Sequence, residues 1–241
     1  AENDVNVIVL DRPNPHAHHV QGPMLDPNFS SFVGLAPVPV VHGMTLGEIA
    51  LMANGEGWLA GGIQANLEVI PCDSYTHSTK YSLPIAPSPN LPTDQSIALY
   101  PSLCFLEPTA VSIGRGTPTP FEITGFPGNT HGELEFTPVP TPGASPNPKH
   151  KNQLCRGDNL SKTQTTWDLK FLVGYANMFR NPQGDLEGFF TSTSFFDKLA
   201  GTDKLRLSLE EGLSAKEIED GWVDDINEFK IARTPYLLYP L

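Results

Sequence analysis

The chain has 241 residues and is poor in cations and in long apolar runs. It carries 15 Lys and Arg against 27 Asp and Glu, a formal net charge of −12. Nucleic acids and anionic bilayers attract basic proteins, so this charge argues against both as partners. Because no stretch of about 18 apolar residues occurs, the sequence predicts no membrane-spanning helix. It also opens without a basic and apolar leader, so we expect an export signal to be absent or already removed.

Cysteine is scarce as well, whereas proline and glycine are abundant. The three cysteines are Cys72, Cys104 and Cys155. They are far apart and form no CxxC motif, so we expect buried free thiols rather than disulfides or a zinc ribbon. The 24 prolines and 21 glycines exceed ordinary usage and predict many turns.

A short cluster of histidines raises the question of a metal. His16 and His18 would share one face of an extended segment, and His19 follows directly. Zinc needs three or four ligands within reach, and no acid is obvious nearby. We therefore expect exposed loop histidines, with no metal and no cofactor.

The hydrophobic pattern predicts an α/β chain of two parts. An apolar strand over 5–10, a helix from Thr45 to about 54 and a strand over 66–70 form one strand–helix–strand unit. Beyond a change in composition near residue 125, helices dominate, at 167–179, 202–211 and from Ser214 to Phe229. We expect a first domain over 1–125 and a smaller α/β (α+β) domain over 126–241. A single such unit makes a poor parallel sheet, so we expect an incomplete chain or a sheet completed by another chain.

The segment Asp11-Arg12-Pro13-Asn14-Pro15 follows the first strand. Ligands of open α/β sheets bind beyond the carboxyl ends of strands, which makes this segment a candidate site. The alternative is a turn that contains an internal Asp–Arg pair.

His42 and Asn90 are two further polar residues that could either bind a ligand or have a structural role. His42 comes just before the predicted helix N-terminus, where free N–H groups suit an anion or polar ligand. Glu48 fits a capping box with Thr45, a structural role. Asn90 lies in the rigid segment PSPNLP and could bind a hydroxylated ligand, unless this segment is only a linker.

The most suggestive cluster is Glu107 with the polar loop that follows it. A carboxyl after the apolar run 103–106 can be desolvated and suited to acid chemistry. In Gly114-Arg115-Gly116-Thr117, the glycines allow close backbone approach and Arg115 offers a planar fork for a carboxylate or sugar hydroxyls. A structural Arg–Glu pair is the alternative. The loop matches neither nucleotide-binding glycine motif, and no Gly-x-Ser-x-Gly elbow occurs.

A series of these motifs resembles the exo-β-N-acetylmuramidase (NamZ-type) family. The motifs run in order along the chain: DRPNP (11–15), GPMLDPNFSSFVGLAPVPVVHGMTLGE (22–48), PSPNLP (87–92), YPSLCFLEPT (100–109), SIGRGTPTPFEITGFP (112–127) and ARTPYLLY (232–239). The chain departs from the family in reading Glu107-Pro108-Thr109 where Glu-Gly-Thr is common, and in its histidine-rich stretch 16–19. The family's longer N-terminal part, which carries its proposed catalytic glutamate, has no counterpart before DRPNP.

The resemblance implies a bacterial, exported glycoside hydrolase that acts outside the cytoplasm. It would release terminal N-acetylmuramic acid from peptidoglycan fragments, in a cleft between a Rossmann-like first domain and a smaller α/β domain. Within this chain Glu107 is the first catalytic candidate and Asp11 the second. Arg12 and Arg115 are two of only three cations in residues 1–125, and we expect them to receive the lactyl carboxylate.

We expect Asn14, His42, Asn90 and Thr117 to complete the saccharide site. Two alternatives stay open at this stage. The chain could be a non-catalytic muropeptide-binding module, or a structural protein of the cell envelope.

Overall fold

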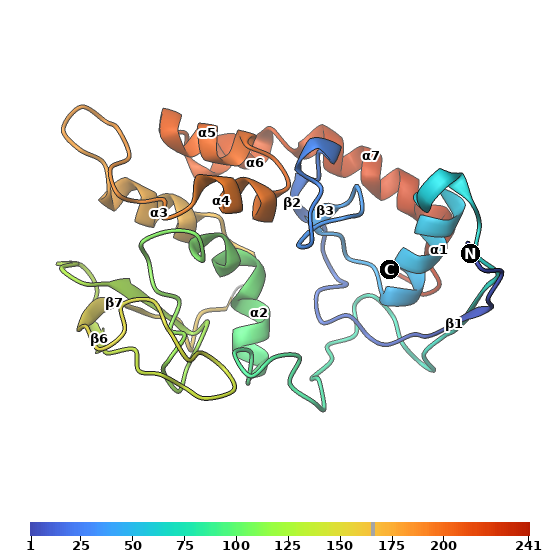
Figure 1. Ribbon diagram of the computed structural model, residues 1–241, viewed down its shortest axis with the longest axis horizontal. Coiled ribbons are helices and arrows are strands. Elements are labelled where there is room, and N and C mark those ends of the chain that lie inside the picture. Colours follow the sequence, from blue (N-terminus) through green and yellow to red (C-terminus); the bar gives the residue numbers. More distant parts are fainter. Residues whose placement is uncertain (165–166) are drawn as a thin grey trace. The chain divides into compact units, whose positions relative to one another are not determined.

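The computed structural model describes residues 1–164 and 167–241 and is built of short helices and strands (Figure 1). It divides into two compact units. The first contains Ala1–Tyr81 together with Gly221–Leu241, and the second contains Ser82–Asp220. The boundary expected near residue 125 falls inside the second unit. Both units mix helices and sheets, so the predicted α/β class is confirmed.

The first unit contains the predicted strand–helix–strand motif. Strands β1 (Val7–Leu10) and β4 (Leu67–Ile70) pair in parallel, from Val7 opposite Leu67 to Leu10 opposite Ile70. Helix α1 (Leu46–Gly55) connects them in sequence and packs on both strands. The approach is close at Gly47, where an added Cβ would lie 2.5 Å from Val69 Cγ1. The glycine in Thr-Leu-Gly-Glu therefore lets the helix start directly on the sheet.

The face of this sheet formed by Ile8 and Leu10 is unusually open. The exposed fractions of these two residues are 60% and 71%. Parallel strands are normally buried on both faces, because connecting helices cover them. Strand β1 thus has the apolar composition of a buried strand, but its Ile8 and Leu10 side chains lie in solvent.

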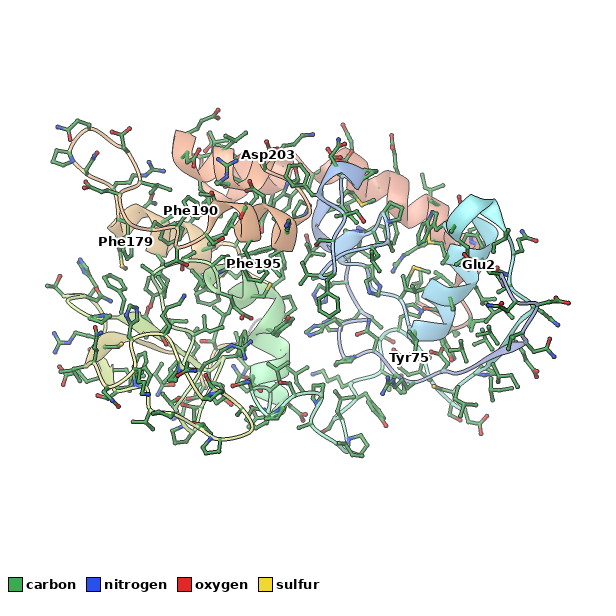
Figure 2. The ribbon with its side chains drawn as sticks, viewed as in Figure 1. Glu2, Tyr75, Phe179, Phe190, Phe195 and Asp203 are labelled. Atoms are coloured by element: carbon green, nitrogen blue, oxygen red, sulfur yellow. The ribbon has the colours of Figure 1, made fainter. Side chains whose placement is uncertain are left out.

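A small antiparallel pair and the chain's C-terminal segment complete the first unit. Strand β2 (Gln21–Met24) pairs with β3 (Pro39–Val41), a pair for which the sequence analysis made no prediction. Helix α7 (Val223–Arg233) contacts β2. Tyr239 packs edge-on against Tyr75, which is labelled in Figure 2, at 4.8 Å between ring centroids.

The second unit joins an antiparallel sheet to several helices. Its strands β5 (Ile123–Phe126), β7 (Cys155–Asn159) and β6 (Leu134–Phe136) lie in that order. Gly157 is required at the centre, since a Cβ there would lie 1.9 Å from the carbonyl oxygen of Thr124. The helices are α2 (Asp94–Leu103), α3 (Lys170–Met178), α4 (Thr193–Ala200), α5 (Lys204–Glu211) and α6 (Ala215–Asp220).

Aromatic side chains fill the core of this second unit. Phe105, Phe189 and Phe196 are completely buried. Phe179 and Phe190, labelled in Figure 2, pack on this group: the ring of Phe179 lies 5.4 Å from Phe189, and that of Phe190 lies 5.0 Å from Phe196. The aromatic core anchors the helical side of the unit.

The helix predictions were correct in part. Helices α3 and α5 lie where expected, and the last predicted helical stretch begins at Ser214, whose nitrogen lies 2.8 Å from Glu217 Oε2. The single helix predicted through Phe229 is instead two, α6 and α7. All three cysteines are free, with Cys104 and Cys155 buried and Cys72 half-buried. Across the described residues, the helices are too short or too polar to span a bilayer.

Candidate active site

Glu107 and Arg115 form an ion pair in the second unit. The Arg115 Nη2 group donates to both carboxylate oxygens of Glu107, at 3.0 Å each. The side chain of Arg115 is 32% exposed and that of Glu107 is 25% exposed, so solvent reaches the pair. This is the Arg–Glu pair that the sequence analysis named as the structural alternative, and the catalytic and binding roles of both residues stay predictions.

The loop that carries Arg115 depends on its two glycines. Gly114 and Gly116 have φ angles of +78° and +83°, a region that strongly favours glycine. A Cβ on Gly114 would lie 2.6 Å from Ile123 Cγ1, and one on Gly116 would lie 2.7 Å from Pro148. Thr117 closes the turn by donating its hydroxyl to the Gly114 carbonyl at 2.7 Å. The hydroxyl predicted for saccharide binding is thus engaged within the loop.

Two aromatic rings border the ion pair, and the sequence interpretation missed both. The Arg115 guanidinium carbon lies 5.1 Å from the centre of the Phe121 ring, which in turn lies 5.1 Å from Tyr100. Burial, together with Cys104 and Glu107, raises the pKa of Tyr100 to about 12, so its hydroxyl stays a donor at neutral pH. Tyr100 precedes Glu107 by seven residues, two helical turns, and that spacing was the available signal.

Only one nitrogen of the Arg115 guanidinium, Nη2, binds Glu107. Among the described residues, its Nε is a buried side-chain nitrogen without a hydrogen-bond partner. A guanidinium presents five N–H donors in a fixed fork, and Glu107 is bound through Nη2 alone. Because Nε is buried, a second carboxylate would bind through the other terminal nitrogen, Nη1.

A lysine that the sequence analysis did not single out holds the Glu107 loop from inside. Lys149 Nζ donates to the carbonyl oxygens of Glu107 at 2.9 Å and Val111 at 2.8 Å, and also to those of Leu106 and Thr109. Burial lowers the pKa of Lys149 to about 8, an effect that Glu107 opposes.

In the first unit, Asp11 caps helix α1. Its Oδ1 accepts from the Gly47 backbone nitrogen at 2.8 Å, and its Oδ2 accepts from the hydroxyls of Thr45 and Tyr239, each at 2.6 Å. Both oxygens are thus occupied by donors from the same unit. Asp11 and Arg12 do not form the internal pair considered as an alternative, because no ion pair joins them among the described residues and Arg12 is exposed.

Glu48 has the structural role expected of a capping box. It is fully buried, and its Oε2 accepts from the Thr45 nitrogen at 2.8 Å. Its Oε1 accepts from His77 Nε2 at 2.9 Å and from the Leu238 nitrogen at 2.8 Å. Burial opposes ionisation, but these hydrogen bonds outweigh it and lower the pKa of Glu48. No sequence pattern marked His77, whereas the C-terminal segment belongs to the motif ARTPYLLY (232–239).

The remaining predicted polar residues hold their own loops. The Asn14 amide donates to the Met44 carbonyl at 2.8 Å, and the Asn90 amide donates to the Ala144 carbonyl at 2.9 Å. His42 Nδ1 accepts from the Met44 nitrogen at 3.1 Å. Burial and the nearby Arg233 lower the pKa of His42 to about 4, so its imidazole is neutral at pH 7.

The histidine-rich stretch is less exposed than expected. His18 is exposed, whereas His16 and His19 are half-buried. The ring of His19 lies 4.4 Å from that of His18 and 5.8 Å from that of His16. Burial and the two neighbouring rings lower the pKa of His19 to about 4. In the part of the chain that the structure describes, no group of three ligating side chains has the geometry to hold a metal ion.

Comparisons with known proteins agree with this architecture. Family models for the N-terminal and C-terminal parts of the exo-β-N-acetylmuramidase NamZ match residues 1–95 and 98–239. The chain belongs to the NamZ family. It is 37% identical over 254 residues to the peptidoglycan β-N-acetylmuramidase NamZ of Bacillus subtilis strain 168, an alignment that includes 99% of this chain.

Two solved structures share the fold. Both are DUF1343 family proteins of Bacteroides fragilis NCTC 9343. The first is 47% identical with a TM-score of 0.91, and covers 100% of this chain and 68% of its own. The second is 23% identical with a TM-score of 0.84, and covers 99% of this chain and 67% of its own, a likeness of fold alone. The chain spans 60% of the length of its NamZ relative from Bacillus.

Proposed function

We propose that this chain forms part of a glycoside hydrolase that releases terminal N-acetylmuramic acid from peptidoglycan fragments. The observation that carries this proposal is the likeness to the Bacillus peptidoglycan β-N-acetylmuramidase, at 37% identity over 99% of the chain. Such an enzyme works on the cell wall, so we further propose that it acts outside the cytoplasm in cell-wall turnover.

In this proposal Arg115 recognises the lactyl carboxylate that distinguishes muramic acid from other amino sugars. The support is its partly exposed guanidinium, which binds Glu107 through Nη2 alone and so keeps its other terminal nitrogen, Nη1, for a second carboxylate. Phe121 beneath the guanidinium fixes the plane of that fork. Arg12, exposed in the first unit, is the second proposed cation for anionic substrate.

Glu107 is the proposed carboxyl of this unit. Both of its oxygens accept hydrogen bonds from the Arg115 guanidinium, so the group takes part in the pair as an acceptor. An ionised carboxylate stabilises the oxocarbenium-like charge that develops when a glycosidic bond breaks. The Tyr100 hydroxyl, which stays protonated at neutral pH, is the neighbouring donor for the sugar.

Asp11 takes a supporting part in this proposal. Its three hydrogen bonds at the start of α1 leave it no free oxygen for a proton transfer. We propose that it organises the loop of Arg12, Asn14 and His42 rather than acting on substrate. The exposed sheet face around Ile8 and Leu10 further suggests that additional polypeptide covers it in the working enzyme.

The test is turnover of a chromogenic β-N-acetylmuramide by a full-length protein containing these residues. The matched control is Arg156→Ala, because Arg156 forms a similar ion pair with Glu135 at 3.2 Å elsewhere in the same unit. We expect turnover by the unsubstituted protein and by Arg156→Ala, and a loss of at least about tenfold in Arg115→Ala. Absence of turnover by the unsubstituted protein would overturn the proposed activity.

One observation favours a second function, a muropeptide-binding module without catalysis. The oxygens of both candidate carboxyls, Glu107 and Asp11, accept hydrogen bonds within their own units. Calorimetry distinguishes the two functions, since a binding module takes up N-acetylmuramic acid and releases no dye from the chromogenic substrate.

A further inference from the structure

The loop over residues 106–111 turns four backbone carbonyls toward one point. The oxygens of Leu106, Glu107, Thr109 and Val111 all accept from the same nitrogen, Lys149 Nζ. Leu106, Thr109 and Val111 are fully buried, so water cannot take over their hydrogen bonds. Carbonyl oxygens that converge in this way form the kind of site that proteins use for metal cations. Here the cation is an ammonium group of the chain itself.

The charge of Lys149 is what makes this arrangement possible. Four carbonyl dipoles pointing at one another repel, and a buried carbonyl without a donor costs about 1–3 kcal/mol. An ammonium has three protons and no acceptor, so it serves all four oxygens only by sharing one proton between two of them. A neutral side chain of the same length would fill the space but would leave the dipoles opposed.

The residues on either side of Lys149 hold the same site. His150 Nε2 lies 2.6 Å from the carbonyl oxygen of Ala110, which also belongs to the Glu107 loop. Pro148 fills the space beside Gly116, where an added Cβ would lie 2.7 Å from the proline ring. Pro148 therefore packs against the loop of Arg115, while Lys149 and His150 bind carbonyl oxygens of the 106–111 loop.

The backbone of this segment is strained in a way that fits such a role. His150 has a φ of +56°, a left-handed conformation that is uncommon outside glycine. Strain of this kind persists where the surrounding contacts over-determine the backbone. The left-handed conformation of His150 lets two neighbouring side chains reach the same loop. The Lys149 ammonium binds the Glu107 carbonyl, and the His150 imidazole binds the Ala110 carbonyl.

We propose that Lys149 is a positioning residue that fixes Glu107 against Arg115 through an internal cation site made of backbone carbonyls. Without the ammonium, the 106–111 loop relaxes and the carboxylate of Glu107 moves from its place on Arg115 Nη2. The positioning claim concerns the loop and holds for any chemistry at Glu107. Its effect on turnover rests on the proposed function.

The test uses Lys149→Ala in the full-length protein and asks whether a free cation restores what the side chain supplied. Propylammonium carries the missing ammonium, and n-propanol has similar bulk without charge. We expect propylammonium to raise the Tm of Lys149→Ala and n-propanol to leave it nearly unchanged. The Tm of the control Lys151→Ala, an exposed neighbour, should respond to neither. Equal effects of the two compounds would show that Lys149 only fills space and would overturn the proposal.

Steady-state turnover is the second test of the positioning role of Lys149. Lys149→Met preserves the bulk of the side chain and removes its charge, and we expect kcat to fall by at least about tenfold while KM changes less. In Lys149→Ala, propylammonium should recover a part of kcat that n-propanol does not. If Lys149→Met turns over at the unsubstituted rate, the positioning role is wrong. If the unsubstituted protein has no turnover, the proposed function fails, whereas the Tm comparison still decides the cation site.

A measurement on the unsubstituted protein covers the case in which both variants fail to fold. An ammonium held by buried carbonyls exchanges its protons slowly, so a ¹⁵N–¹H signal of the Lys149 side chain should be visible by NMR near neutral pH. Lys149→Arg, the assignment control, should lack this signal. Rapid exchange of the Lys149 ammonium, like that of the exposed Lys151, would contradict the site.

Discussion

Arg115 holds both carboxylate oxygens of Glu107 with one nitrogen, Nη2, at 3.0 Å each. The rest of the guanidinium is therefore not committed to this pair, and its Nε has no hydrogen-bond partner among the described residues. A half-exposed ion pair with spare donors is a reasonable binding device but a weak source of stability, because exposed pairs contribute only about 0–1 kcal/mol. Substitutions in the Glu107–Arg115 pair should therefore change activity much more than they change the free energy of unfolding.

Glu107→Gln should therefore lower activity without unfolding the protein. The amide has nearly the same shape but lacks the charge that pairs with Arg115. We expect the free energy of unfolding to fall by less than about 1 kcal/mol, and turnover of the chromogenic muramide to fall by at least about 100-fold, the size of an electrostatic contribution to the transition state. Urea unfolding and steady-state kinetics on the same preparation measure both. Equal activity in Glu107→Gln and in the control Glu135→Gln would exclude Glu107 from the reaction.

Asp11→Asn should show the opposite pattern. The amide cannot accept from the Gly47 nitrogen and from both hydroxyls as the carboxylate does, so the start of α1 loses hydrogen bonds that its Thr45–Glu48 capping box does not replace. We expect a loss of about 1–3 kcal/mol in the free energy of unfolding. Turnover per folded molecule should be nearly unchanged at low temperature.

The exposed Asp73 supplies the control for this substitution, as Asp73→Asn. A variant Asp11→Asn that is as stable as this control, but inactive, would show that the carboxyl of Asp11 acts on substrate and not on the helix.

His77→Ala should be among the most destabilising single substitutions in the first unit. His77 and Glu48 are 2% and 0% exposed, and the histidine also lies 3.3 Å from the Ala17 carbonyl through Nδ1. His77→Ala removes the side-chain donor of buried Glu48, which keeps only its backbone donors, and this loss costs about 1–3 kcal/mol. Thermal or urea unfolding measures this loss, with the exposed His131→Ala as control. A change below about 1 kcal/mol would mean that Glu48 is satisfied without the histidine.

The protein should lose stability in mild acid because His42 is held neutral. Burial and Arg233 lower its folded-state pKa to about 4, below the ordinary 6.5. Between these two values the unfolded chain binds a proton that the folded chain does not, so stability falls as pH drops from 6.5 toward 4. This histidine alone contributes a slope of up to about 1.4 kcal/mol per pH unit.

His42→Asn tests this assignment, because its side-chain oxygen can still accept from Met44 but does not titrate. We expect a shallower fall of Tm between pH 6.5 and pH 4 than in the unsubstituted protein or in the exposed control His131→Asn. An unchanged slope would assign the acid sensitivity to other groups, of which His19 is the next in line.

The parts of the structure that follow from local pattern were predictable. Alternating apolar residues and the Thr45–Glu48 capping box predicted the strand–helix–strand unit, and the pairing of Glu107 with Arg115 was foreseen only as the structural alternative to a substrate site. Helix α2 was missed because Pro101 lies inside it, a position where proline usually ends a helix.

The missed features depend on contacts between residues far apart in the chain. Tyr239 reaches Asp11 across 228 positions, and Arg233 donates to the carbonyls of His42 and Gly43 across about 190. Lys149 finds its four carbonyls about 40 positions earlier. A single sequence contains no periodicity or motif that marks such pairs, since each is created only when the loops are folded.

Substrate selectivity shows whether Arg115 recognises the carboxylate of muramic acid. The measurement is kcat/KM of the full-length protein for a chromogenic β-N-acetylmuramide and for the matching β-N-acetylglucosaminide, which lacks the lactyl group, before and after Arg115→Ala. We predict that the preference for the muramide falls by at least about tenfold in Arg115→Ala, as expected for loss of a charge-assisted hydrogen bond. An unchanged preference in this variant would contradict the account.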